Sequence, residues 1–70
     1  MMPLKLADAG TVYTIQRVGG KEEIKKHLEN LGFVPGAEIQ IITQHDGNLI
    51  VNVKESRVAI SKEMAAKIYV

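Results

Sequence analysis

Residues 21–39 read KEEIKKHLENLGFVPGAEI, and the order of residue types in this segment is that of a helix, a tight turn and a strand. Two glutamates stand in the first turn of the helix, where they interact favourably with its dipole. Gly32 can adopt the left-handed backbone that often follows a helix, and Pro35-Gly36 has the residue types that a type II turn requires at its centre. Apolar residues recur along one helical face at spacings of four and three: Ile24, Leu28 and Leu31. We therefore predict a helix over about residues 21–31, followed by a turn.

Outside this segment the chain has the composition of a β protein. Of its twenty Ile, Val and Leu residues, fifteen are the β-branched Ile and Val, which pack well on a pleated sheet. The last strand is too short to form a sheet edge alone, so we expect it to pair with the first. The expected fold is mainly β: a single domain of residues 1–70 that forms a small, five-stranded, partly open barrel with one inserted helix. The predicted strands span residues 11–18, 37–45, 49–55, 57–60 and 68–70, and Ser61 caps a short helical turn over residues 62–66 before the last of them.

The strands over residues 37–45 and 49–55 form a hairpin around Asp46-Gly47-Asn48. A two-residue Asp-Gly turn is the familiar choice, but it would place Ile39 opposite Lys54 and mix apolar with polar residues on one face. A slip of one residue moves every side chain of a strand to the other face, so the buried face decides the register. We therefore predict a three-residue loop, which pairs Ile39 with Glu55, Ile41 with Val53, Thr43 with Val51 and His45 with Leu49.

The composition excludes several classes of function. Without cysteine, the chain can form no disulfide, thiolate metal site or cysteine nucleophile. No apolar run exceeds three residues, so we expect no membrane insertion and no signal-peptide core, and the cytoplasm is the default location. Nine basic residues stand against eight acidic ones, and the chain has two tyrosines, one phenylalanine and no tryptophan. A nucleic-acid partner is not expected, because such a binder needs a basic groove with several stacking rings.

No catalytic residues are expected either. Gly19-Gly20-Lys21 resembles the end of a phosphate-binding loop, but that motif needs a glycine where Ile15 stands and Ser or Thr where Glu22 stands. The two serines occupy turn and cap positions, with no neighbouring histidine and no nucleophile elbow. The sequence therefore predicts a protein that is not an enzyme.

Two pairs of residues are candidate ligands for a transition metal. Glu23 and His27 are four residues apart on the predicted helix, and His45 is followed by Asp46 at the hairpin tip. The alternative for the first pair is a half-buried histidine beside the apolar stripe with one hydrogen bond, or a weak ion pair with Glu23. For the second pair the alternative is a plain turn. Neither pair contains enough ligands for a complete site, so we predict no required cofactor.

The function class that remains is recognition of a partner at the protein surface. The best candidate for the contact is the segment Phe33-Val34-Pro35-Gly36. Two bulky apolar residues in a turn either pack onto the helix or stay on the surface. Phe33 can fold back onto Leu28, which is the usual apolar contact at such a helix end, so both interpretations stay open for it. Val34 is the residue that we expect at the surface.

The segment Leu31-Gly32-Phe33-Val34-Pro35-Gly36-Ala37-Glu38-Ile39 resembles the ferrous iron transport protein A (FeoA) family, in which a helix ends in Leu/Met-Gly-apolar-x-Pro-Gly before a strand. The resemblance extends over essentially the whole chain. It includes the opening with Leu4 and Leu6 and the close, VAISKEMA over residues 58–65 and then IYV over residues 68–70. At one point the chain departs from the pattern, because Ala9 stands where the family often has proline before the glycine.

This resemblance implies an SH3-like barrel with an inserted helix and a cytosolic accessory role in Fe(II) uptake. The implied partner is the cytosolic region of FeoB, the membrane ferrous-iron transporter with a GTPase domain, and the contact that we expect uses Leu31, Phe33, Val34 and Pro35. Similar domains occur in iron-dependent repressors, which makes weak binding of Fe2+ or Mn2+ for sensing or delivery the alternative function. A third hypothesis is regulation of the GTPase, although no arginine finger is identifiable. Weak self-association through strand edges also remains open.

Overall fold

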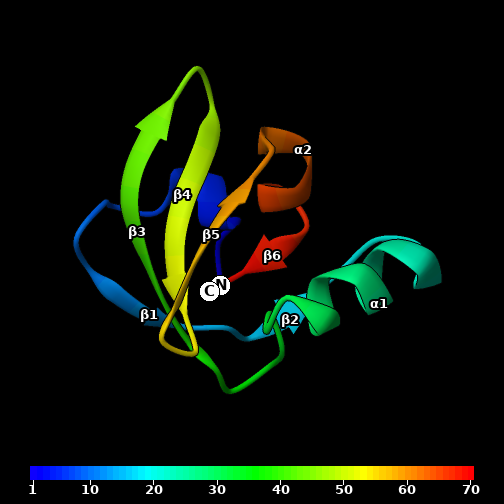
Figure 1. Cartoon of the computed structure of the whole chain (residues 1–70). Helices are drawn as coiled ribbons and strands as arrows, with labels where there is room; N and C mark the ends of the chain where they lie inside the picture. Colours follow the sequence, from blue (N-terminus) through cyan, green and yellow to red (C-terminus); the bar gives the residue numbers. More distant parts are fainter.

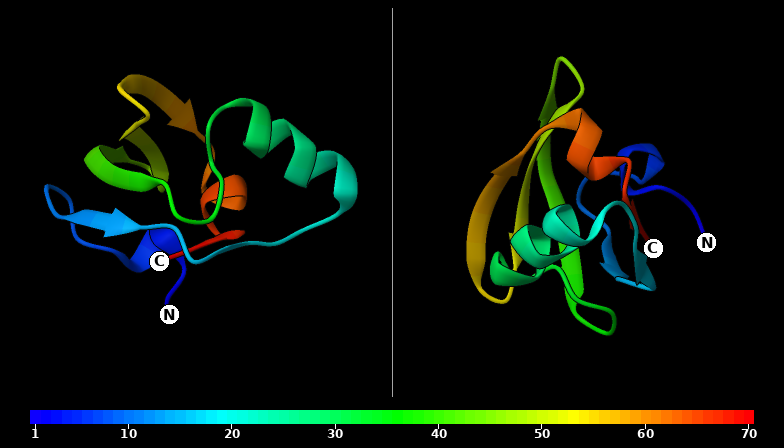
Figure 2. Two further views of the ribbon diagram at one scale, coloured as in Figure 1. Left: turned by 90° about the horizontal axis from the view of Figure 1, so that it is seen from below. Right: turned by 90° about the vertical axis from the view of Figure 1, so that its right-hand side faces the viewer.

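The computed structural model describes residues 1–70 and contains six strands, two α-helices and one turn of 3-10 helix (Figure 1). Four strands form one sheet in the order β1-β3-β4-β5, and the other two form a second sheet, β2-β6. Figure 2 shows α1 beside the strands rather than on a sheet face, with the two ends of the chain close together. In chain order the elements are η1 (Leu4–Leu6), β1 (Val12–Thr14), β2 (Arg17–Val18), α1 (Glu22–Asn30), β3 (Glu38–His45), β4 (Asn48–Val53), β5 (Ser56–Ile60), α2 (Lys62–Ala65) and β6 (Ile68–Tyr69).

The mainly β fold with an inserted helix is confirmed, but the predicted first strand is divided into β1 and β2. The division has a hydrogen-bonding cause at Ile15 and Gln16. The Ile15 N–H donates to the Ala37 carbonyl at 2.8 Å, on the β3 side, whereas the Gln16 N–H donates to the Tyr69 carbonyl at 2.8 Å, on the β6 side. The chain therefore leaves one sheet and joins the other at this point, and the predicted pairing of the last strand with the first is confirmed for β2 and β6.

One apolar core fills the space between the sheets and α1. Twelve hydrophobic side chains are buried, and no polar or charged side chain is buried with them. The domain is small, so this burial must offset most of the conformational entropy that folding removes. The core residues are Leu4, Ile15, Leu28, Phe33, Ile39, Ile41, Leu49, Val51, Val53, Ile60, Ala65 and Ile68.

The end of α1 has the geometry that its sequence predicts. The Phe33 N–H donates to the Leu28 carbonyl and the Gly32 N–H to the Glu29 carbonyl, both at 2.9 Å, and Gly32 has a φ of 103°. These two bonds satisfy carbonyls that the helix itself leaves unpaired. The type II turn that we predicted at Pro35-Gly36 is also present, since the Ala37 N–H donates to the Val34 carbonyl at 3.1 Å and Gly36 has a φ of 91°.

The predicted loop of the β3–β4 hairpin is wrong. His45 pairs with Asn48, so the loop has two residues, Asp46 and Gly47, both with positive φ. The apolar face is nevertheless kept, because a bulge between Ile41 and Thr43 shifts the register within β3. On the side of the bulge away from the hairpin tip, Ile39 pairs with Val53 rather than Glu55, and Ile41 pairs with Val51. The extra residue, Ile42, thus corrects the register that the two-residue turn alone would impose.

The cap of α2 is as predicted. The Ser61 Oγ accepts a hydrogen bond from the Met64 N–H at 3.2 Å, as an N-cap side chain does. In a further side-chain hydrogen bond, the Lys62 N–H donates to the Asn48 Oδ1 at 3.2 Å. This bond joins the start of α2 to the start of β4.

A second two-residue turn connects β4 to β5, and it consists of Lys54 and Glu55. Both have positive φ, 49° and 64°, which is the left-handed region that L-residues avoid. Non-glycine residues in that region cost roughly 1–2 kcal/mol each. The turn is therefore strained in a small protein with little stability to spare.

We expect the substitution Glu55→Gly to raise the free energy of unfolding by about 0.5–1 kcal/mol. Glycine removes the left-handed penalty but loses about 0.5–1 kcal/mol of additional conformational entropy on folding. Urea unfolding at 25 °C measures the difference. The matched control is Ser56→Gly one residue later, where the backbone has no positive φ and glycine should destabilise the strand. A Glu55→Gly variant that is less stable than the wild type would show that the turn is not strained.

Candidate functional site

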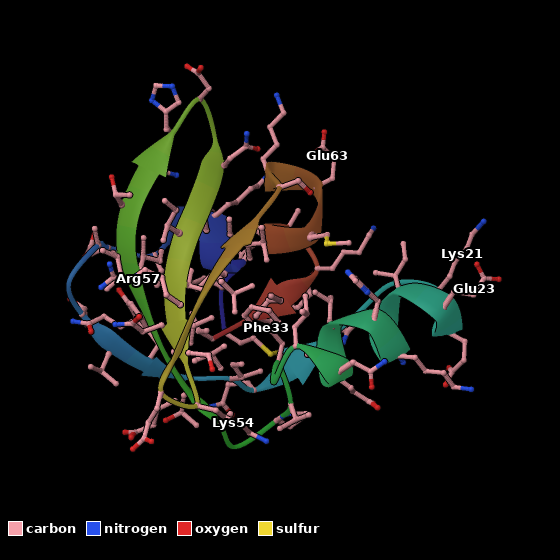
Figure 3. The ribbon with its side chains drawn as sticks, viewed as in Figure 1. Lys21, Glu23, Phe33, Lys54, Arg57 and Glu63 are labelled. Carbon is pink, nitrogen blue, oxygen red and sulfur yellow. The ribbon has the colours of Figure 1, made fainter.

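The predicted contact residues lie in the turn between α1 and β3, which we call the helix-exit turn (residues 31–36). Phe33 is fully buried, with 0% of its surface exposed, and Figure 3 shows it between α1 and the barrel. The prediction is therefore corrected for Phe33, because its side chain packs in the core and cannot itself touch a partner. Leu31 is half-buried and packs against the core, whereas Val34 is half-buried outside that cluster and Pro35 is exposed.

Hydrogen bonds hold the helix-exit turn on both sides. Within the turn the Ala37 N–H donates to the Val34 carbonyl at 3.1 Å. On the other side the Gly36 N–H donates to the Ile15 carbonyl at 2.8 Å. The Ile15 N–H returns a bond to Ala37, so the turn is attached to the point where the chain passes between the two sheets. Val34 and Pro35 are thus presented on a fixed backbone, which lowers the entropy that a contact through them would lose.

The candidate metal ligands form two separate pairs. The His45 Nε2 lies 3.4 Å from the Asp46 Oδ2, and the two side chains are 90% and 86% exposed. Glu23 and His27 are both exposed on α1, which corrects the half-buried interpretation of His27. Figure 3 places Glu23 toward the outer end of α1, away from the hairpin tip that carries the other pair.

The structure contains no group of three or more His, Asp or Glu side chains that could hold a metal ion. Fe2+ and Mn2+ favour more ligands than one such pair supplies, and a ligating histidine usually has a fixed second hydrogen bond. No such bond is present for His27 or for His45. Each pair could contribute at most two ligands to an ion that other molecules also coordinate.

Two surface features arise from strand register, and sequence reasoning missed both. Val12, Gln40, Asn52 and Arg57 stand opposite one another in a row across all four strands of the large sheet. A hollow of about 350 Å3 lies beside this row and is lined in part by Val12, Gln40 and Asn52. On the small sheet the Arg17 guanidinium lies over the Tyr69 ring, 5.2 Å from its centroid, as a cation–π pair. The sequence shows the alternation of residues along each strand, but it does not show the register that aligns one strand with the next.

Neither helix has the length and apolar character that crossing a membrane requires.

Comparison with known proteins gives a consistent result over the whole chain. A family model described as FeoA domain matches residues 2–70. A crystal structure described as iron uptake regulatory protein (FeoA) is similar with a TM-score of 0.88 and 28% identity, and the match covers 96% of this chain and 91% of that one. The solution structure of iron(II) transport protein A from Clostridium thermocellum has a TM-score of 0.88 and 27% identity over 97% of this chain and 43% of that one. No curated protein sequence matches the chain.

Two further similarities concern the fold alone. FeoA of Stenotrophomonas maltophilia, solved in complex with zinc and described as an SH3 domain protein, has a TM-score of 0.84 and 24% identity over 99% of this chain and 88% of that one. A manganese-dependent transcriptional repressor has a TM-score of 0.88 and 15% identity over 97% of this chain, which corresponds to 39% of the repressor. The expected SH3-like barrel is confirmed by these matches.

We expect Phe33→Ala to cost about 3–5 kcal/mol of unfolding free energy, as large-to-small substitutions of a buried phenylalanine do. A domain of this size has a total stability of roughly 3.5–10 kcal/mol, so this substitution should remove a large fraction of the total. Phe33→Leu keeps part of the volume and should stay folded, with a loss of about 1–2 kcal/mol. Urea unfolding of the wild type, both variants and Val34→Ala tests the assignment, and a Val34→Ala loss as large as that of Phe33→Ala would contradict it.

Proposed function

The chain belongs to the FeoA domain family, and from this premise we propose that it is a non-enzymatic cytoplasmic accessory of ferrous iron transport that docks on the cytosolic region of the FeoB transporter. The observation that carries the proposal is the family match over residues 2–70, together with similarity to FeoA structures along nearly the entire chain.

The helix-exit turn is the docking surface that we favour. An apolar residue that is only half covered, next to an exposed proline on a fixed turn, is a suitable anchor for a protein contact. Leu31 packs against the core, and Phe33 acts by holding the turn in place rather than by contact. A partner that covers Val34 and Pro35 would remove apolar surface from water at little cost in backbone ordering.

We expect Val34→Asp to leave the fold intact and to reduce iron uptake several-fold in cells that depend on FeoB. The new carboxylate would be desolvated when the partner covers it, whereas in the free protein it stays in contact with water. Amide spectra of the purified variant establish its folding, and radioactive iron uptake measures its function. The matched control is Ile50→Asp, the same kind of change at a half-exposed residue on the outer face of β4. Undiminished uptake by a folded Val34→Asp variant would remove the helix-exit turn as the docking surface.

Metal binding is the second candidate function, and the observation that favours it is the 3.4 Å approach of His45 and Asp46. The docking function needs no metal on this chain. We therefore expect anaerobic calorimetry with Fe(II) or Mn(II) to give no saturable heat, because two exposed ligands hold either ion too weakly. A saturable heat that is lost in the His45→Ala variant would instead support a sensing or delivery module.

A further inference from the structure

The largest hollow of the surface, about 420 Å3, lies where η1, the tip of the β3–β4 hairpin and α2 meet, and we call it the hairpin-tip hollow. Lys5, Leu6, Gln44, Lys62 and Glu63 contribute to its lining. In Figure 1 the hairpin tip is at the top of the molecule, whereas the turn between α1 and β3 is at the bottom. This surface is therefore separate from the helix-exit turn.

Lys62 is held in position at one wall of the hollow. Its backbone N–H donates to the Asn48 Oδ1 at 3.2 Å. Its methylene groups lie against Gly47, where an added Cβ would be 3.0 Å from the Lys62 Cδ and 3.3 Å from its Cβ. Contact of the stem with Gly47 removes some rotamers of this exposed side chain, which lowers the side-chain entropy that is lost when the ammonium group meets an anion.

Among the residues that line the hollow, positive charge exceeds negative charge. No carboxylate lies within 4.0 Å of the ammonium group of Lys5 or of Lys62, since the single close pair of this kind in the structure is His45 with Asp46 at the neighbouring hairpin tip. Glu63 is the one carboxylate in the lining, and Figure 3 shows it at the outer end of α2. Two ammonium groups against one carboxylate favour an anionic occupant.

An apolar contact lies beside these charges. Leu6 is 65% exposed, and apart from the terminal Met1 it is the most exposed large hydrophobic residue. Single exposed leucines are common and require no explanation by themselves. Here the leucine adjoins a hollow that also presents two unpaired ammonium groups, so the surface can accept an aliphatic side chain and a carboxylate together.

We propose that the hairpin-tip hollow is a second docking surface, which binds an acidic–apolar peptide segment of a partner protein. The aliphatic side chains of the segment lie against Leu6, and its carboxylates face Lys5 and Lys62. The volume has room for a few side chains of an extended segment rather than for a folded domain. The charge complementarity and the adjacent leucine identify the occupant, and this inference stands independently of docking through the helix-exit turn.

The test is a titration of the isotope-labelled protein with a capped peptide of about eight residues in which Asp and Leu alternate. We expect localised amide shifts at Lys5, Leu6, Gln44 and Gly47, and weaker binding as NaCl is raised because salt screens exposed charges. Peptides that alternate Lys with Leu, or Asp with Ser, should bind much more weakly. Phosphatidylserine vesicles should not shift these amides, and vesicle binding without binding of the Asp–Leu peptide would overturn the proposal in favour of a lipid surface.

Variants assign the contacts. The double variant Lys5→Gln/Lys62→Gln should weaken binding of the Asp–Leu peptide roughly three- to tenfold, as expected for the loss of two exposed charge pairs. Leu6→Ser should weaken it as well without changing the salt dependence. Lys21→Gln/Lys26→Gln is the matched control, because it removes the same charge from exposed positions on and beside α1. Equal affinity of the two double variants, or shifts confined to other residues, would overturn the proposal.

Discussion

The structure depends on the pair of hydrogen bonds that Ile15 makes with the turn after α1. Its N–H donates to Ala37 and its carbonyl accepts from Gly36, while the next residue, Gln16, bonds to Tyr69 in the other sheet. Ile15 is itself buried in the core, so these bonds form away from competing water. One short stretch of backbone thereby connects the large sheet, the small sheet and the end of α1. The helix-exit turn has a fixed position for this reason.

Among side-chain contributions, apolar burial in the core accounts for nearly all the stability of this fold. No polar side chain is buried, and the one close pair of opposite charge is exposed at the hairpin tip, where it adds little. Against this burial stand the costs of the strained Lys54–Glu55 turn and of five glycines with positive φ. Most charged groups are thus free for contacts with other molecules, because the core contains no charged side chain.

The two surfaces described above lie at opposite ends of a small barrel. One end presents half-covered apolar residues on a turn that α1 and the sheets hold rigid, and the other presents two lysines and a leucine around a hollow. Their chemistries differ, so the same partner segment does not suit both. The proposed docking on the transporter uses one end, and the proposed acidic–apolar segment binds at the other.

Local patterns in the sequence were sufficient for several elements whose stabilising groups lie close together in the chain. The apolar stripe of α1, the Gly32 helix end, the Pro35-Gly36 turn and the Ser61 cap each depend on residues within a few positions of one another. The resemblance of residues 31–39 likewise located the helix-exit turn and pointed to the family. The sequence also showed correctly that Ile39 and Ile41 must share a buried face with β4.

Tertiary structure decided how that face was formed. The bulge at Ile42, the division of the first strand at Ile15 and the burial of Phe33 all depend on partners far away in the chain, such as Val51, Ala37 and Tyr69. The burial pattern alone does not distinguish a bulge from a longer loop when both keep the same residues buried, and the local Asp46-Gly47 preference for a two-residue turn was the better guide. The hairpin-tip hollow exists for the same reason, because Lys5 and Lys62 become neighbours only when η1 and α2 pack around one core. Propensities act over short stretches of chain, whereas register and surface charge patterns are set by the packing of the whole domain.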